Sequence, residues 1–174
     1  MGKKRTYGVE RGSFRMNKEE LQRKVRSAAY ELHNTGVAIS PVDLFMKIGI
    51  LSKKDYEDWR MGRVPYLEKI CQANLSKLSV AMKELRNYAQ ENNLKPSKTA
   101  YMKWGKGKHI KLRFSKYNNP KIEEAYSTHY VDKTKAAELK QNIKDKQIQT
   151  TDQNGVMTLT KCEGNVLFVL HPPL

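Results

Sequence analysis

The sequence contains few cysteines, no long hydrophobic run and no recognisable leader. Its two cysteines, Cys71 and Cys162, lie far apart and outside any CxxC or Cys/His cluster, which argues against a cysteine-based zinc site. We expect both thiols to be buried and reduced. The longest aliphatic or aromatic run, Val166 to Leu170, is too short to cross a bilayer, and the basic N-terminus lacks the apolar core of a signal peptide. These absences predict a cytoplasmic protein that does not enter a membrane.

Acidic residues are also scarce. The 174 residues include 18 Asp and Glu against 33 Lys and Arg, which gives a formal net charge of +15 and a pI near 9.8. A chain of this length can bury a core of its own, so we expect the charge to belong to a folded protein. Because such an imbalance attracts polyanions, nucleic acid is the first candidate partner.

Helix start signals divide the first half of the chain into four helices. Asn17 and Glu20 form a capping box, and Ser40 and Ser52 can cap the next two helices. A proline in its first turn opens the longest helix, which carries a single apolar stripe. The stripe predicts a core face, with the seam of a homodimer as the alternative. The expected helices run from Asn17 to Gly36, from Pro41 to Ile48, from Lys53 to Met61 and from Pro65 to Ala89.

After the long helix the hydrophobic pattern becomes alternating, which is typical of strands. Residues 99–104 and 109–114 flank the turn Gly105-Lys106-Gly107-Lys108, so the sequence predicts a β-hairpin. Its inner face is expected to hold Met102, Trp104, Ile110, Leu112 and Phe114. Its outer face is expected to hold Tyr101, Lys103, His109, Lys111 and Arg113.

The remainder of the chain is less strongly patterned. Asn119-Pro120 starts a short helix that we expect to reach about Tyr130, and residues 132–149 form either a helical arm or a linker. Residues 156–161 and 165–170 predict a terminal hairpin that must dock on another surface, because an isolated hairpin is marginally stable. We therefore expect a basic arm at residues 1–16, a helical body with the basic hairpin at residues 17–131, and an appendage at residues 132–174.

The strongest functional signal is a stretch without acids. No Asp or Glu occurs between Glu91 and Glu123, and aromatic rings alternate there with cations. Cations can contact phosphates while flat rings stack on bases, so this combination predicts nucleic-acid binding. The alternative is an ordinary solvated lysine face that covers buried aromatics. The candidate residues are Lys95, Lys98, Tyr101, Lys103, Lys106, Lys108, His109, Lys111, Arg113, Lys116 and Tyr117.

Helices followed by a basic hairpin resemble a winged-helix module, with the hairpin as the wing. Helix 53–60 is a poor recognition helix because its acids Asp55, Glu57 and Asp58 would repel phosphates. Other cations lie nearer the hairpin or on the long helix, and the N-terminal arm is either a second phosphate contact or a solubilising tail. These further candidates are Arg60, Arg63, Lys77, Lys3, Lys4 and Arg5.

Signals for catalysis are weak. The only compact group that could bind a metal is Glu123, Glu124, His129 and Asp132, and adjacent glutamates diverge on a helix. We therefore expect a mainly helical α+β protein, without cofactor or metal, that binds nucleic acid without catalysing a reaction, duplex DNA being favoured over RNA. The alternatives are an RNA- or single-strand-binding protein, a metal-dependent nuclease, and a basic adaptor that binds an acidic protein.

Overall fold

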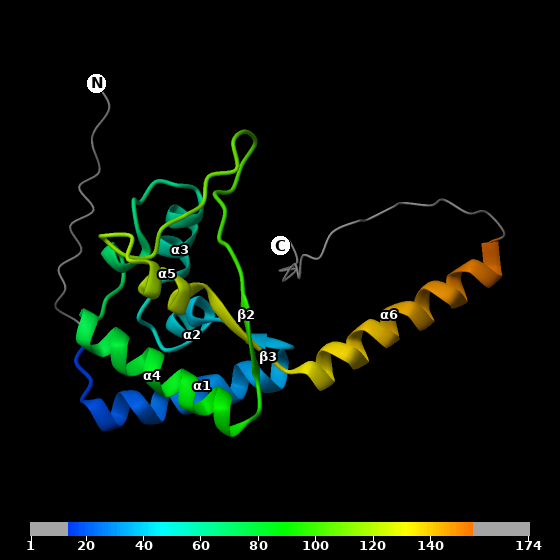
Figure 1. Cartoon of the computed structure of the whole chain (residues 1–174), viewed down its shortest axis with the longest axis horizontal. Helices are drawn as coiled ribbons and strands as arrows, with labels where there is room; N and C mark the ends of the chain where they lie inside the picture. The colour runs from blue at the N-terminus through cyan, green and yellow to red at the C-terminus, as the bar shows by residue number, and fades with distance from the viewer. Residues whose placement is uncertain (1–13, 155–174) are drawn as a thin grey trace. The chain divides into compact units, whose positions relative to one another are not determined.

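The structure is a computed structural model that describes residues 14–154, so residues 1–13 of the predicted N-terminal arm and the predicted terminal hairpin lie outside the described residues. Its contacts divide the chain into two units between Ala137 and Glu138. The first unit is a mainly helical α+β body, which confirms the expected class (Figure 1). Its elements are α1 (Lys18–Thr35), β1 (Ala38–Ile39), α2 (Pro41–Lys47), α3 (Lys53–Arg60), η1 (Leu67–Lys69), α4 (Leu75–Glu91), β2 (Lys95–Lys98), α5 (Pro120–Ser127) and β3 (Thr128–Val131).

The first three helices begin where the capping residues predict. The side chains of Asn17, Ser40 and Ser52 accept hydrogen bonds from backbone amides three residues on, at 2.7, 2.9 and 3.1 Å. Gly49 and Gly62 follow α2 and α3 with φ values of +80° and +70°, a conformation that favours glycine. Local signals therefore set these helix boundaries.

The predicted helix from Pro65 is wrong in its first part. Residues 67–69 form only a 3₁₀ turn, and α4 starts at Leu75 after Asn74 caps the amide of Lys77 at 2.9 Å. Leu67 and Cys71 are buried at a helical spacing without a continuous helix, whereas Leu75 is exposed. Apolar spacing alone cannot distinguish these cases, and the capping residue marks the true start.

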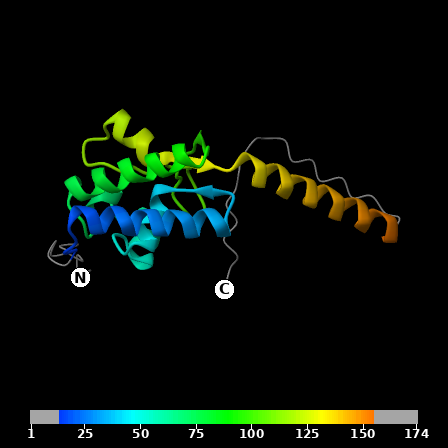
Figure 2. The same ribbon diagram turned by 90° about the horizontal axis from the view of Figure 1, so that it is seen from below.

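Helices α1 and α4 lie side by side and form much of the body (Figure 2). Leu21 and Val25 of α1 and Leu78 and Leu85 of α4 are buried in the same core. Arg26 ties the two helices together, because it pairs with Glu84 at 2.5 Å and with Glu91 at 2.8 Å. The α4 stripe is thus core, as the spacing predicts.

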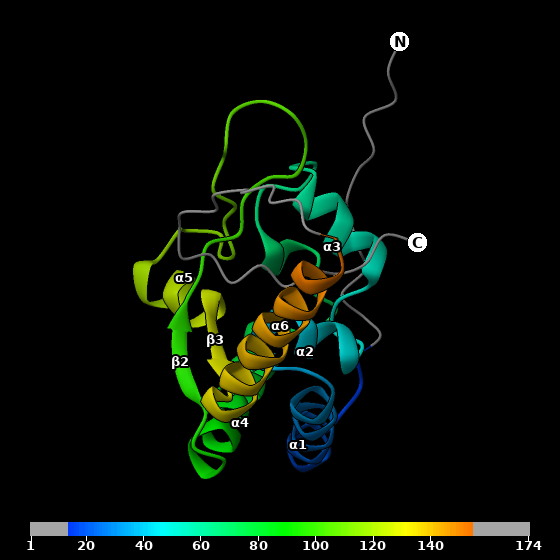
Figure 3. The same cartoon turned by 90° about the vertical axis from the view of Figure 1, so that its right-hand side faces the viewer.

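A small antiparallel sheet of three strands has the order β1-β3-β2 (Figure 3). The central strand β3 corrects the expectation that the helix from Asn119 continues to Tyr130, because α5 ends at Ser127. Strand β2 has the sequence Lys-Pro-Ser-Lys and is fully exposed at the edge of the sheet. Lysine and proline are typical of edge strands, since both discourage further pairing.

The second unit begins inside α6 (Lys133–Asn154), so the polar segment after Asp132 is a helical arm and not a linker. Its Leu139 and Ile143 are exposed. Among the described residues no helix is long and apolar enough to cross a membrane.

Candidate nucleic-acid interface

The acid-free stretch forms a loop, here called the basic loop and defined as residues 99–116, that projects from the helices (Figures 1 and 3). Its two arms are held by amide bonds from Lys103 to the Ile110 carbonyl and from Leu112 to the Tyr101 carbonyl, both 2.8 Å. Met102 and Lys111 form the single bridge between them. The turn is where the sequence places it, but two continuous strands, as predicted for residues 99–104 and 109–114, are not formed.

The returning arm is anchored in the core. Phe114 is buried, and its ring lies 5.2 Å from Trp59 and 5.7 Å from Tyr126. The Trp59 indole N–H donates to the Arg113 carbonyl at 2.9 Å. The root of the basic loop is therefore fixed although its tip projects.

Glu123 provides a second anchor for this arm. Its buried carboxylate accepts hydrogen bonds from the amides of Phe114 and Ser115 and from the Ser115 hydroxyl, at 2.6–3.2 Å. The same α5 turn is capped by Asn119. Because the Glu123 carboxylate accepts all of these hydrogen bonds from the returning arm, it positions the basic loop.

Tyr101 is not the exposed stacking platform that the alternation predicts. It is 8% exposed, and its hydroxyl lies 2.9 Å from His129 Nε2. Because Tyr101 lies directly across from Leu112, both side chains share one face, and that face is buried. Burial raises the pKa of Tyr101 above its ordinary value.

Trp104 and Ile110 were expected in the core and are instead 41% and 51% exposed. Both lie nearer the turn of the loop than Tyr101 and Leu112, where the body covers them only in part. Alternation gives the face of a residue but not the distance that its strand extends past the core. Tyr117, by contrast, is exposed as predicted, at 82%.

The cations of the basic loop are exposed to solvent. Within residues 14–154, they form no ion pair with a carboxylate of the same chain. Like charges at this density repel one another, and an anion would relieve that repulsion. The exposed cations are Lys103, Lys106, Lys108, Lys111, Arg113 and Lys116, and His109 is exposed beside them.

Four other candidates have partners within the chain: Lys98, Arg63, Arg60 and Lys77. Lys98 pairs with Glu124 and Arg63 with Asp58, at 2.8 and 2.7 Å.

The guanidinium of Arg60 lies among aromatic rings, and Lys77 Nζ donates to the Phe14 carbonyl at 2.5 Å. Lys95 is exposed on β2, whereas Lys3, Lys4 and Arg5 lie outside the described residues. The structure therefore brings only part of the predicted set together, on one loop.

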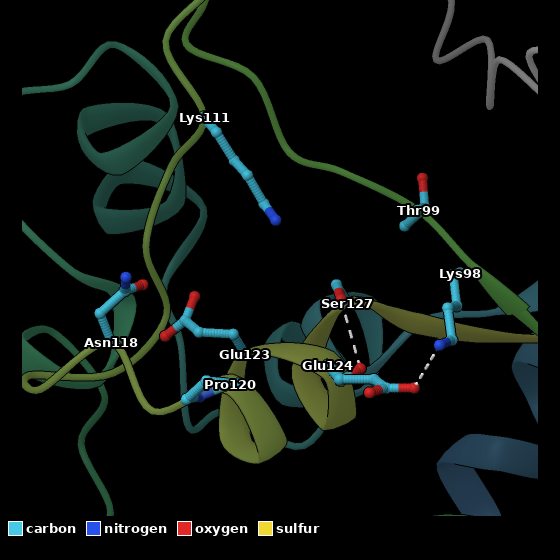
Figure 4. A pocket seen from close by; sticks show the side chains of 8 residues that line it. All are labelled: Lys98, Thr99, Lys111, Asn118, Pro120, Glu123, Glu124 and Ser127. Carbon is cyan, nitrogen blue, oxygen red and sulfur yellow. Dashed lines mark hydrogen bonds and ion pairs between the residues drawn. The ribbon is translucent and has the colours of Figure 1, made fainter.

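A polar pocket of about 380 Å³ lies between the end of β2, the basic loop and α5 (Figure 4). The amine of Lys111 extends into this space, and the Lys98–Glu124 pair stands at its other side. The remaining lining residues are Thr99, Asn118, Pro120, Glu123 and Ser127. Because cations and carboxylates both line the pocket, it does not favour a ligand of one charge sign.

The residues considered for a nuclease site have different partners. Glu123 binds backbone amides, Glu124 pairs with Lys98, and His129 contacts Tyr101. Asp132 lies 3.1 Å from His33 and accepts from the first amides of α6. In the described part of the chain, no group of three or more His, Cys, Asp or Glu residues is arranged to hold a metal ion.

The sequence nominated the polar face of the long helix through Lys77, but not the residues that the structure exposes on α4. The two acids of α4, Glu84 and Glu91, are bound by Arg26, so the solvent side carries polar and basic residues together with the exposed Leu75. The helical period, when it is counted from Asn74 onward, separates the buried side of α4 from its exposed side. The exposed residues of this side are Ser76, Ser79, Lys83, Arg86 and Gln90.

The fold and the basic loop together define a mainly helical α+β protein with a projecting cationic surface. Comparisons with protein-family models, curated proteins and solved structures find no match to this chain.

Proposed function

We propose that this protein binds nucleic acid without catalysing a reaction, and that the basic loop contacts the phosphate backbone. The observation that carries the proposal is the set of exposed cations on a projecting, acid-free loop whose root is fixed in the core. A fixed root lowers the entropy lost when the loop binds, and a row of lysines attracts a polyanion such as a phosphate backbone.

The arrangement of elements supports a winged-helix-like mode on duplex DNA. Helices precede the paired strands β2 and β3, and these strands bracket the basic loop in the position of a wing. In α3, Asp58 pairs with Arg63 and Asp55 bonds Ser52, but Glu57 is exposed and would still repel a phosphate backbone. The acid-free side of α4 is the better helix to place against a duplex.

The proposal is tested by charge removal from the loop. Replacement of five loop cations by Gln should lower affinity and flatten the dependence of log K on log[salt] by about 0.9 for each lost duplex contact. Thermal stability should hardly change, because the side chains are exposed. The five residues are Lys103, Lys106, Lys108, Lys111 and Arg113.

A charge-matched control separates loop contacts from net charge. It removes five exposed cations from other surfaces and should retain a much larger share of the affinity and the salt slope. An equal loss of affinity in both variants would show that net charge alone, and not the loop, determines binding. Failure of the wild type to retain any nucleic acid at low salt would refute the proposal. The control replaces Lys18, Arg23, Lys24, Lys53 and Lys54 by Gln.

A further inference from the structure

Trp104 is an exposed ring that directly precedes the turn of the basic loop and is held in a fixed position there. Its backbone N–H donates to the Arg60 carbonyl at 2.7 Å, which ties it to the end of α3. The Arg60 guanidinium lies 4.6 Å from its ring centroid, and Tyr56 meets the ring edge-on at 5.8 Å. The ring is thus supported from the protein side while 41% of the residue remains exposed.

The support behind Trp104 is itself rigid. The Arg60 guanidinium also lies over Tyr56 and Tyr101, at 5.7 and 5.2 Å, and donates to the Tyr56 hydroxyl at 3.0 Å. Because Tyr101 is buried against Trp59, this stack continues into the core. A ring positioned in this way loses little freedom when a flat ligand covers it.

The surroundings of Trp104 combine apolar surface with positive charge. Ile110 lies opposite Lys103, next to Trp104 in the loop, and Met61 follows Arg60; both apolar side chains are exposed. The stem of Lys103 passes over Gly62, within 3.0 Å of where a Cβ would stand. A flat apolar group with phosphate attached would satisfy both properties of this surface.

We propose that Trp104 stacks on a nucleobase, so that the nucleic acid preferred by this loop has an unpaired or unstacked base. This inference rests on the proposed binding of nucleic acid, and it replaces the intact duplex by a single strand or a duplex with a distorted site as the substrate class. In an intact duplex the base faces are covered by their neighbours, and only a single strand or a distorted site offers one. Trp104 is bound to the end of α3 through its backbone N–H, and the turn that follows it carries glycines and lysines, an arrangement less suited to inserting an aromatic ring into a lipid surface.

The two tryptophans make the contact directly measurable. Trp59 is 0% exposed and its indole N–H is bonded inside the core, so a ligand-dependent change in emission should come from Trp104. Three labelled oligonucleotides of equal length are compared: a single strand, a duplex with three unpaired bases, and a perfect duplex. Binding is followed independently by anisotropy of the label.

We expect quenching with the first two oligonucleotides and little with the perfect duplex. The change Trp104→Leu should remove the quenching and lower affinity for unpaired bases about tenfold, with little effect on the perfect duplex. Leucine keeps apolar bulk, and the emission of Trp59 with far-ultraviolet circular dichroism reports whether the variant is folded. Tyr30→Ala, which removes an exposed ring on α1, should change affinity less than about twofold.

The outcomes separate the inference from the proposed function. Tight binding without quenching, and without an effect of Trp104→Leu, would overturn the stacking role and leave the proposed function intact. Equal losses in the Trp104 and Tyr30 variants would also overturn it. Binding of no oligonucleotide would remove both proposals, and retention only on vesicles of phosphatidylserine and phosphatidylcholine would assign the surface to lipid.

Discussion

Adjacent glutamates in α5 have opposite environments. Glu123 is buried and accepts hydrogen bonds from Phe114 and Ser115, whereas Glu124 pairs with Lys98 at the surface. Glu123→Gln places an N–H where the loop offers only donors, and we expect it to lower the free energy of unfolding by about 2–3 kcal/mol.

The neighbouring change serves as the control in urea denaturation. Glu124→Gln should alter the free energy of unfolding by less than about 1 kcal/mol, because an exposed ion pair contributes little. Similar effects of the two changes would show that the buried carboxylate does not anchor the loop.

His129 makes stability depend on pH. Burial lowers its pKa below the ordinary value of 6.5, although Asp43 opposes this effect, and the ring contacts the Tyr101 hydroxyl. Below about pH 6.5 the unfolded chain binds a proton that the folded chain resists, so this residue lowers stability as the pH falls.

The change His129→Gln keeps a hydrogen-bond acceptor for Tyr101 and removes the titration. We expect the variant to lose less stability than the wild type between pH 7 and pH 5, measured by urea denaturation at both values. An identical pH dependence would exclude His129 as a contributor.

At the scale of elements, local signals predicted local structure well. The caps Asn17, Ser40 and Ser52 placed three helices, because a side chain bonding an amide three residues away depends on little else. The long helix failed where buried residues kept helical spacing through the 3₁₀ turn at residues 67–69. Its buried stripe was nevertheless correct from Leu78 onward.

The strands of the sheet could not be predicted from local signals in the same way. Strand β1 has two residues and β2 consists of Lys, Pro, Ser and Lys, so neither carries an alternating apolar pattern, and both pair with β3 across a large sequence separation. The candidate site shares this limit. Its cations were predicted from composition, but the burial of Tyr101 and the exposure of Trp104 depend on register and on how far the loop projects.

At the scale of the whole molecule, the division between Ala137 and Glu138 predicts which part folds alone. A fragment of residues 1–137 should unfold cooperatively within about 4 °C of the full chain, a shift that about 1 kcal/mol would cause, and should keep the salt-dependent binding. A fragment of residues 1–127 lacks β3, which pairs with both other strands and buries Tyr130, so it should show no cooperative transition by circular dichroism. Loss of the transition in the longer fragment would mean that residues after Ala137 are required to complete the fold of the first unit.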